Sequence, residues 1–106
     1  MGRTQEAERL LRQGIPLFPQ DGTVWYELGR VQAARGDLRE AAASFGACLE
    51  RSPAYLLAYA ARARTLAHLG MMEEAREIAL QGLRLDATNG ELRKAVDEIR
   101  FLEKKN

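Results

Sequence analysis

The chain repeats itself at an offset of 34 residues. This offset aligns three sets of like residues: Ala7, Ala41 and Ala75; Glu6, Glu40 and Glu74; and Ile15, Leu49 and Leu83. A period of this length is typical of a helix-turn-helix unit, which buries its apolar face only by stacking on its neighbours. The sequence therefore predicts a row of stacked helix pairs.

Residues within each period indicate helices joined by tight turns. Apolar side chains recur at steps of three and four, as in Leu38, Ala41 and Phe45, which is the spacing of an amphipathic helix. No stretch alternates convincingly with a period of two residues. Gly36 and Gly70 interrupt the helical pattern where the chain must reverse, because glycine adopts left-handed dihedral angles at low cost. We expect an all-α fold.

Six helices are predicted, and proline and capping signals suggest where some of them begin or end. Their ranges are Thr4–Ile15, Thr23–Arg35, Leu38–Arg51, Pro53–Leu69, Met72–Leu85 and Asn89–Lys104. Pro16 ends the first helix, while Ser52 and Pro53 fit an N-cap followed by proline in the first turn. Thr88 and Glu91 have the spacing of a capping box at the start of the last helix.

Charge and composition argue against several classes of partner. The chain has 16 basic and 15 acidic residues and a net charge of +1, so it has no strong field to attract nucleic acid or an anionic membrane. No segment approaches the roughly eighteen apolar residues of a membrane span, and the N-terminus lacks an apolar signal core. Cys48 is the only cysteine, which excludes an intramolecular disulfide and fits a cytoplasmic location.

Residues that could carry catalysis or bind metal do not form a recognisable set. His68 is the only histidine and has no cysteine nearby, so neither a histidine metal site nor a triad can be assembled. Glu73, Glu74 and Glu77 could suggest an acid–base pair. However, Glu73 and Glu77 have the spacing of a solvated stripe, and Glu73 and Glu74 begin a helix where the helix dipole favours negative charge. Cys48 is interpreted as a small apolar filler. We expect no enzyme activity, no cofactor and no metal.

One period carries a nearly complete family pattern. Its residues are Trp25, Tyr26, Glu27, Leu28, Gly29, Gly36, Asp37, Leu38, Glu40, Ala41, Phe45, Leu49 and Pro53. This pattern resembles the tetratricopeptide repeat (TPR). Gly29 and Ala41 would let the two helices of the repeat approach closely, while Trp25 and Phe45 would fill the space between neighbouring helices. The next period is weaker, since it has Ala63 in place of the glycine and Ala79 in place of the large aromatic residue.

The resemblance covers practically the whole chain and implies its domain plan. It predicts one TPR domain over 1–106, with a half repeat at 1–21, repeats at 22–55 and 56–89 and a capping helix at 90–106. The fold would be a right-handed superhelix of antiparallel helix pairs. The cap would place an apolar stripe on the second repeat: Leu92, Val96, Ile99 and Leu102.

At the other end, the first helix resembles the second helix of a repeat without its partner. Ala7, Leu10 and Leu11 would therefore lack cover. Exposed apolar patches of this kind commonly mark interfaces. We expect either a homo-oligomer that forms through this helix or truncation from a longer array.

In a TPR protein the first helix of each repeat lines a concave groove, and the resemblance implies that this groove binds a protein or peptide partner. The predicted groove residues are Tyr26, Arg30, Ala33, Leu57, Ala60, Arg64 and His68. Lys94, Glu98 and Phe101 would form its far edge. Tyr26 would serve as an aromatic anchor. Arg30 and Arg64 lie one period apart and could hold a carboxylate together, or they could pair with neighbouring carboxylates and only keep the groove soluble.

The leading interpretation is a binding module with a scaffold, adaptor or chaperone-like role. The alternative is a structural spacer or oligomerisation segment of a larger TPR protein. TPR co-chaperones that grip acidic chaperone tails use basic residues and asparagines in the groove. This chain has Leu57 and Ala61 where Lys and Arg are expected and Glu27 where Asn is expected, so we predict no tight binding to such tails.

Overall fold

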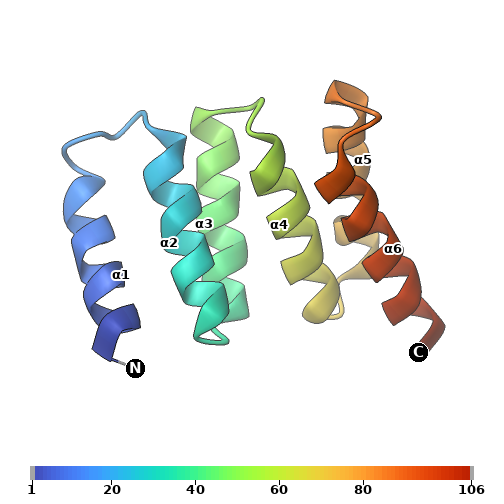
Figure 1. Ribbon diagram of the computed structural model, residues 1–106, viewed down its shortest axis with the longest axis horizontal. Helices are drawn as coiled ribbons and strands as arrows, with labels where there is room; N and C mark the ends of the chain where they lie inside the picture. Colours follow the sequence, from blue (N-terminus) through green and yellow to red (C-terminus); the bar gives the residue numbers. More distant parts are fainter. Residues whose placement is uncertain (1, 106) are drawn as a thin grey trace.

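A computed structural model describes residues 2–105 of the chain, so Met1 and Asn106 of the predicted domain lie outside the described part. Six helices follow one another in a row (Figure 1). They are α1 (Gly2–Gly14), α2 (Gly22–Ala34), α3 (Leu38–Arg51), α4 (Leu56–His68), α5 (Met72–Leu85) and α6 (Gly90–Lys105). Residues 2–105 contain no strand, which confirms the expected all-α class.

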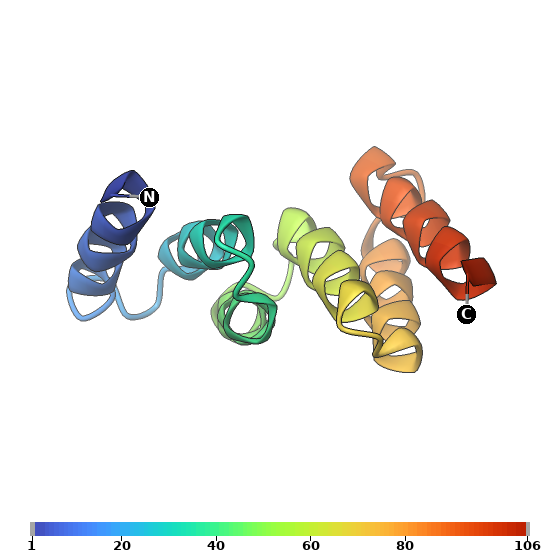
Figure 2. The same ribbon diagram turned by 90° about the horizontal axis from the view of Figure 1, so that it is seen from below.

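The helices pack as two antiparallel hairpins with one further helix at each end. The pairs α2–α3 and α4–α5 form the hairpins, and α3 also packs on α4 (Figure 2). At one end α1 packs on α2, whereas at the other end α6 packs on both α4 and α5. The result is an elongated body of 39 × 29 × 19 Å. None of the described helices combines the length and apolarity needed to cross a bilayer.

Both hairpin turns depend on a glycine with a positive φ. Gly36 and Gly70 each have φ of 85°, as the sequence predicted. In the first turn, the N–H of Gly36 donates to Ala33 O at 3.0 Å and the N–H of Asp37 donates to Gln32 O at 2.9 Å. This pair of hydrogen bonds is the Schellman arrangement, which satisfies the last carbonyls of α2 and reverses the chain.

Replacing Gly36 by alanine is expected to lower the free energy of unfolding by about 1–2 kcal/mol, because an L-residue is strained in the left-handed region. A Cβ at Gly36 would meet no atom within 4 Å, so the loss would come from the backbone alone. Gly90→Ala is the matched control, since that Cβ is equally free and the φ of Gly90 is not positive. Urea denaturation should show a loss only for Gly36→Ala, and equal effects would contradict this account.

The predicted start of α4 is wrong. The helix begins at Leu56 after Tyr55 as N-cap, whereas Ser52 is the C-cap of α3. The N–H of Ser52 donates to Cys48 O at 2.8 Å, and its carbonyl accepts from the N–H of Tyr55 at 3.0 Å. A serine–proline pair therefore forms a turn here and does not cap a helix, because Ser52 still completes the last turn of α3.

The predicted capping box of α6 is also wrong, although the helix begins where expected. Asn89 Oδ1 accepts a hydrogen bond from the N–H of Leu92 at 3.0 Å and thereby caps the helix. The hydroxyl and the N–H of Thr88 donate instead to Asp86 Oδ1, at 2.9 and 3.1 Å. Because Thr88 is hydrogen-bonded to Asp86, the next residue, Asn89, caps the helix.

The first hairpin is held together by a large ring packed against a glycine. Phe45 is 2% exposed, and a Cβ on Gly29 would lie only 2.6 Å from its Cε1 atom. Gly29 therefore allows the close approach that the sequence predicted. In the second hairpin Ala63 and Ala79 take these two places and are both buried. Alanine is larger than the glycine on the first helix of the pair and smaller than the phenylalanine on the second, so the two differences offset each other.

The cap buries its apolar stripe as expected. Leu92, Ala95 and Ile99 are buried, and Val96 and Leu102 pack beside them. The stripe covers α4 and α5, so α6 closes this end of the row.

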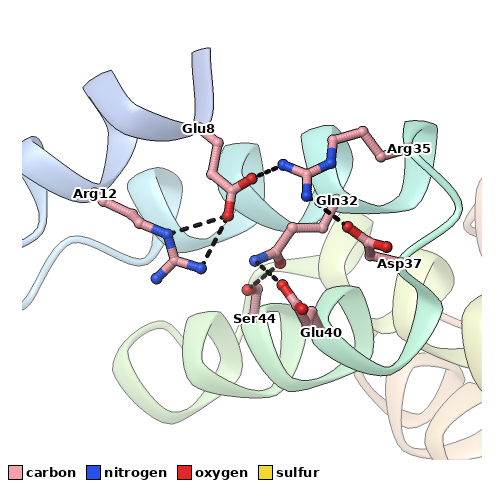
Figure 3. Close-up of polar contacts among 7 residues, drawn as sticks. All are labelled: Glu8, Arg12, Gln32, Arg35, Asp37, Glu40 and Ser44. Atoms are coloured by element: carbon pink, nitrogen blue, oxygen red, sulfur yellow. Dashed lines mark hydrogen bonds and ion pairs between the residues drawn. The ribbon is translucent and has the colours of Figure 1, made fainter. Parts of the chain in front are cut away.

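At the N-terminal end, an ion pair joins α1 to the end of α2 (Figure 3). Glu8 accepts two hydrogen bonds from Arg12, at 2.9 and 3.1 Å, and pairs with Arg35 at the end of α2. The hydrogen bond from Arg12 is the main cause that lowers the pKa of Glu8, and Arg35 adds to it although burial opposes both. Beside this pair, buried Ser44 donates to Oε1 of buried Gln32 at 2.6 Å.

The contact between Glu8 and Arg35 has counterparts one and two periods along the chain. The equivalent positions hold the ion pairs Glu8–Arg35 and Arg76–Glu103 at the two ends, and Ala42 and Leu69 of one apolar cluster between them. The two ion pairs have opposite polarity.

The apolar side chains at the N-terminal end are largely uncovered. Leu10 is 55% exposed, and Leu17 and Phe18 in the loop after α1 are also exposed. Ala7 and Leu11 are half-buried against α2. The predicted self-association through α1 remains a prediction.

Candidate functional site: the α2–α4 groove

A depression of about 390 Å³ lies between α2 and α4, and we call it the α2–α4 groove. Its lining residues are Tyr26, Arg30 and Ala33 of α2, Leu38 and Phe45 of α3, Ala61, Arg64, Thr65 and His68 of α4, and Glu98 of α6. The residues of α2 and α4 recur at steps of three and four, so each helix presents one stripe to the groove. The α3 side chains lie beneath and form an apolar floor.

The structure brings together five of the seven predicted groove residues: Tyr26, Arg30, Ala33, Arg64 and His68. Leu57 is exposed at the start of α4 but does not line the depression. Ala60 is 2% exposed and packs against Leu92 and Ala95 of the cap. Ala60 is therefore a core residue that a partner cannot reach, which corrects its assignment to the groove surface.

One end of the α2–α4 groove is aromatic. The ring of Tyr26 lies 5.0 Å from that of Tyr55 and 5.7 Å from that of Phe45, measured between centroids. The Arg30 guanidinium lies 6.0 Å from the Tyr26 centroid. Burial raises the pKa of Tyr26, so its phenol is neutral and can donate a hydrogen bond. Tyr55 was not identified from the sequence. The helix was expected to begin at Pro53, whereas Tyr55 precedes α4 as its N-cap.

The other end is charged, and its charges are already paired. Arg64 Nη2 lies 3.4 Å from Glu91 Oε2, and Arg64 Nε lies 3.6 Å from Glu98 Oε1. His68 Nε2 lies 2.6 Å from Glu98 Oε2. On the opposite side Arg30 lies 3.5 Å from a carboxylate of its own helix, that of Glu27. The structure thus shows the arginines paired with neighbouring carboxylates, which was the second of the two sequence-based alternatives.

Of the three cap residues expected at the far edge, only Glu98 lines the α2–α4 groove. Lys94 and Phe101 are exposed on α6 outside the depression. Glu98 is positioned by its neighbours on the helix, since Ala95 and Ile99 are buried against α4 and α5. The cap therefore contributes a fixed carboxylate to the charged end.

Metal binding or nucleophilic chemistry would need suitable side chains in and around the α2–α4 groove. Among residues 2–105, no three His, Cys, Asp or Glu side chains gather to hold a metal ion. Burial raises the pKa of the Cys48 thiol to about 11, so it is protonated at neutral pH and lies buried in α3 as a small apolar side chain. The groove lining combines an aromatic ring, small side chains on its walls and paired charges.

Comparison with known proteins agrees with this architecture. Family models described as tetratricopeptide repeat match residues 32–99 and residues 1–53. The chain belongs to the tetratricopeptide-repeat family. The TPR resemblance predicted from the sequence is thereby confirmed. A search of the curated proteins found no match.

A solved TPR structure shares the fold. It is described as the first TPR of Spaghetti (RPAP3) bound to the HSP90 peptide SRMEEVD, and it superimposes with a TM-score of 0.85. The match covers 98% of this chain and 80% of that chain at 20% sequence identity. It confirms the TPR-type superhelix. TPR is a protein-interaction fold, so the chain is a protein-interaction module.

Proposed function

We propose that the chain binds a peptide or helix of a partner protein in the α2–α4 groove and acts as a scaffold or adaptor. The observation that supports this most is the groove itself, which Tyr26, Arg30 and Arg64 line together with the small side chains of Ala33 and Ala61. A ring with a polar tip and arginines are the side chains enriched at binding hot spots, and small residues leave room for a partner segment. The buried free thiol of Cys48 suits a cytoplasmic location.

A second proposed function, as a spacer or oligomerisation segment, is favoured by the uncovered Leu10, Leu17 and Phe18 at the N-terminal end. In that case the partner would be a second copy or a longer array, and the α2–α4 groove would stay empty.

Filling the groove is expected to abolish capture of the partner. Ala33→Arg would place a long charged side chain on the groove wall, whereas Ala43→Arg makes the same change on the exposed surface of α3 outside the lining set. Each protein, shown to be folded by circular dichroism, would be used to capture proteins from a lysate of the source organism. We expect at least about a tenfold loss with Ala33→Arg only, which corresponds to roughly 1.4 kcal/mol.

The possible outcomes separate the two proposed functions. A partner retained by both variants would show that binding occurs elsewhere on the chain. If the unchanged protein captures only further copies of itself, the oligomerisation function would replace the groove function.

A further inference from the structure

We infer that Glu98 is a resident carboxylate of the α2–α4 groove, which occupies the place that an acidic side chain of a partner would take. Its presence disfavours acidic segments and leaves the groove to segments that present an apolar side chain. This inference rests on the proposed binding function and names the class of segment that the groove accepts.

The carboxylate of Glu98 contacts Arg64 and His68 in the way that a carboxylate of a bound segment would. One carboxylate oxygen lies 3.6 Å from Arg64 Nε and the other lies 2.6 Å from His68 Nε2, so the side chain spans these two groups of α4. Arg64 Nε is buried and makes no hydrogen bond, so Glu98 faces it through charge alone. The buried neighbours Ala95 and Ile99 fix α6 and keep the carboxylate in place.

An acidic partner would gain little at this position. To reach Arg64 it would have to displace Glu98, which exchanges one carboxylate for another and leaves two like charges side by side. The other charges of the groove add to the repulsion. Arg30 and Arg64 are matched by three carboxylates, those of Glu27, Glu91 and Glu98.

An apolar side chain can enter without breaking any of these pairs. The space between the arginines is bounded by Ala33, Ala61 and Thr65, with Leu38 and Phe45 beneath. Ala33, Leu38 and Ala61 are partly exposed and offer apolar surface, and burial of apolar surface is favourable whatever the state of the charges around it. Tyr26 lines the same depression, and its ring packs on that of Tyr55 with the centroids 5.0 Å apart.

The decisive experiment is a titration of the Glu98→Gln variant with the acidic peptide SRMEEVD by calorimetry at low ionic strength. Glu77→Gln is the control, because it removes the same charge from an exposed position on α5 outside the groove. We expect at least a tenfold tighter association with Glu98→Gln than with the unchanged protein or the control. The gain should disappear at high salt, where exposed charges are screened.

The apolar preference is tested on the unchanged protein with N-acetyl-tryptophanamide, a neutral aromatic probe, by amide chemical shifts. We expect saturable shifts at Ala33, Ala61 and Thr65. No shift there, or equal association of the two glutamine variants with SRMEEVD, would overturn the inference. The proposed function would still stand if Ala33→Arg abolished capture of the natural partner, so the two failures are distinguishable.

Discussion

Phe45→Ala is expected to lower the free energy of unfolding by about 3–5 kcal/mol, the range for truncation of a buried aromatic side chain. Phe45 is among the largest fully buried side chains, and its ring fills the space that Gly29 leaves on α2. The cavity could close only by movement of α2 towards α3. Because stabilities of small domains are about 5–15 kcal/mol, this one change would leave the first hairpin marginal.

Urea denaturation followed by circular dichroism measures the loss, and Phe101→Ala provides the control. Phe101 is 58% exposed on α6, so its removal is expected to change the free energy by no more than about 0.5 kcal/mol. Phe45 also lies on the floor of the α2–α4 groove, and partner capture should weaken together with stability. Equal effects of the two substitutions would show that the hairpin does not depend on this ring.

The helical row could be predicted from the sequence because its determinants are local. Gly36 and Gly70 mark the two reversals by their backbone conformation, and Gly29 marks the close approach of α2 to Phe45. Helix starts were predicted less well, because Ser52 and Thr88 match capping signatures but form hydrogen bonds to other groups. A capping signature identifies residues that are able to cap a helix. Which of them caps it depends on the other hydrogen bonds that each one forms.

The site was harder to predict because the cap breaks the equivalence of the repeats. Tyr26 and Ala60 occupy the same place one period apart, yet Tyr26 lines the groove and Ala60 is buried under α6. Similarly, Arg64 faces carboxylates that α6 supplies, whereas the carboxylate paired with Arg30 in the described part of the chain is Glu27 of its own helix. Period counting places residues on a helix face, and the packing of the terminal helix determines whether that face stays open.

Leu92→Ala is expected to lower the free energy of unfolding by about 2–5 kcal/mol and to loosen the cap first. Leu92 is fully buried where α6 meets α4 and α5, and a Cβ on Gly82 would lie 2.7 Å from its Cδ2 atom. Stacked repeats contact only their neighbours, so damage at one end of the row should spread weakly to the other. Hydrogen exchange should therefore show loss of protection in α6 while α2 and α3 stay protected.

The same substitution connects stability with recognition, because α6 carries Glu98 into the α2–α4 groove. When the cap loosens, Arg64 and His68 lose the carboxylate that faces them. The Leu92→Ala protein should then bind SRMEEVD more tightly than Leu85→Ala, a matched control in which an exposed leucine is removed from α5. Uniform loss of protection over all six helices would mean instead that the row unfolds as one unit, and the cap could not open the groove independently.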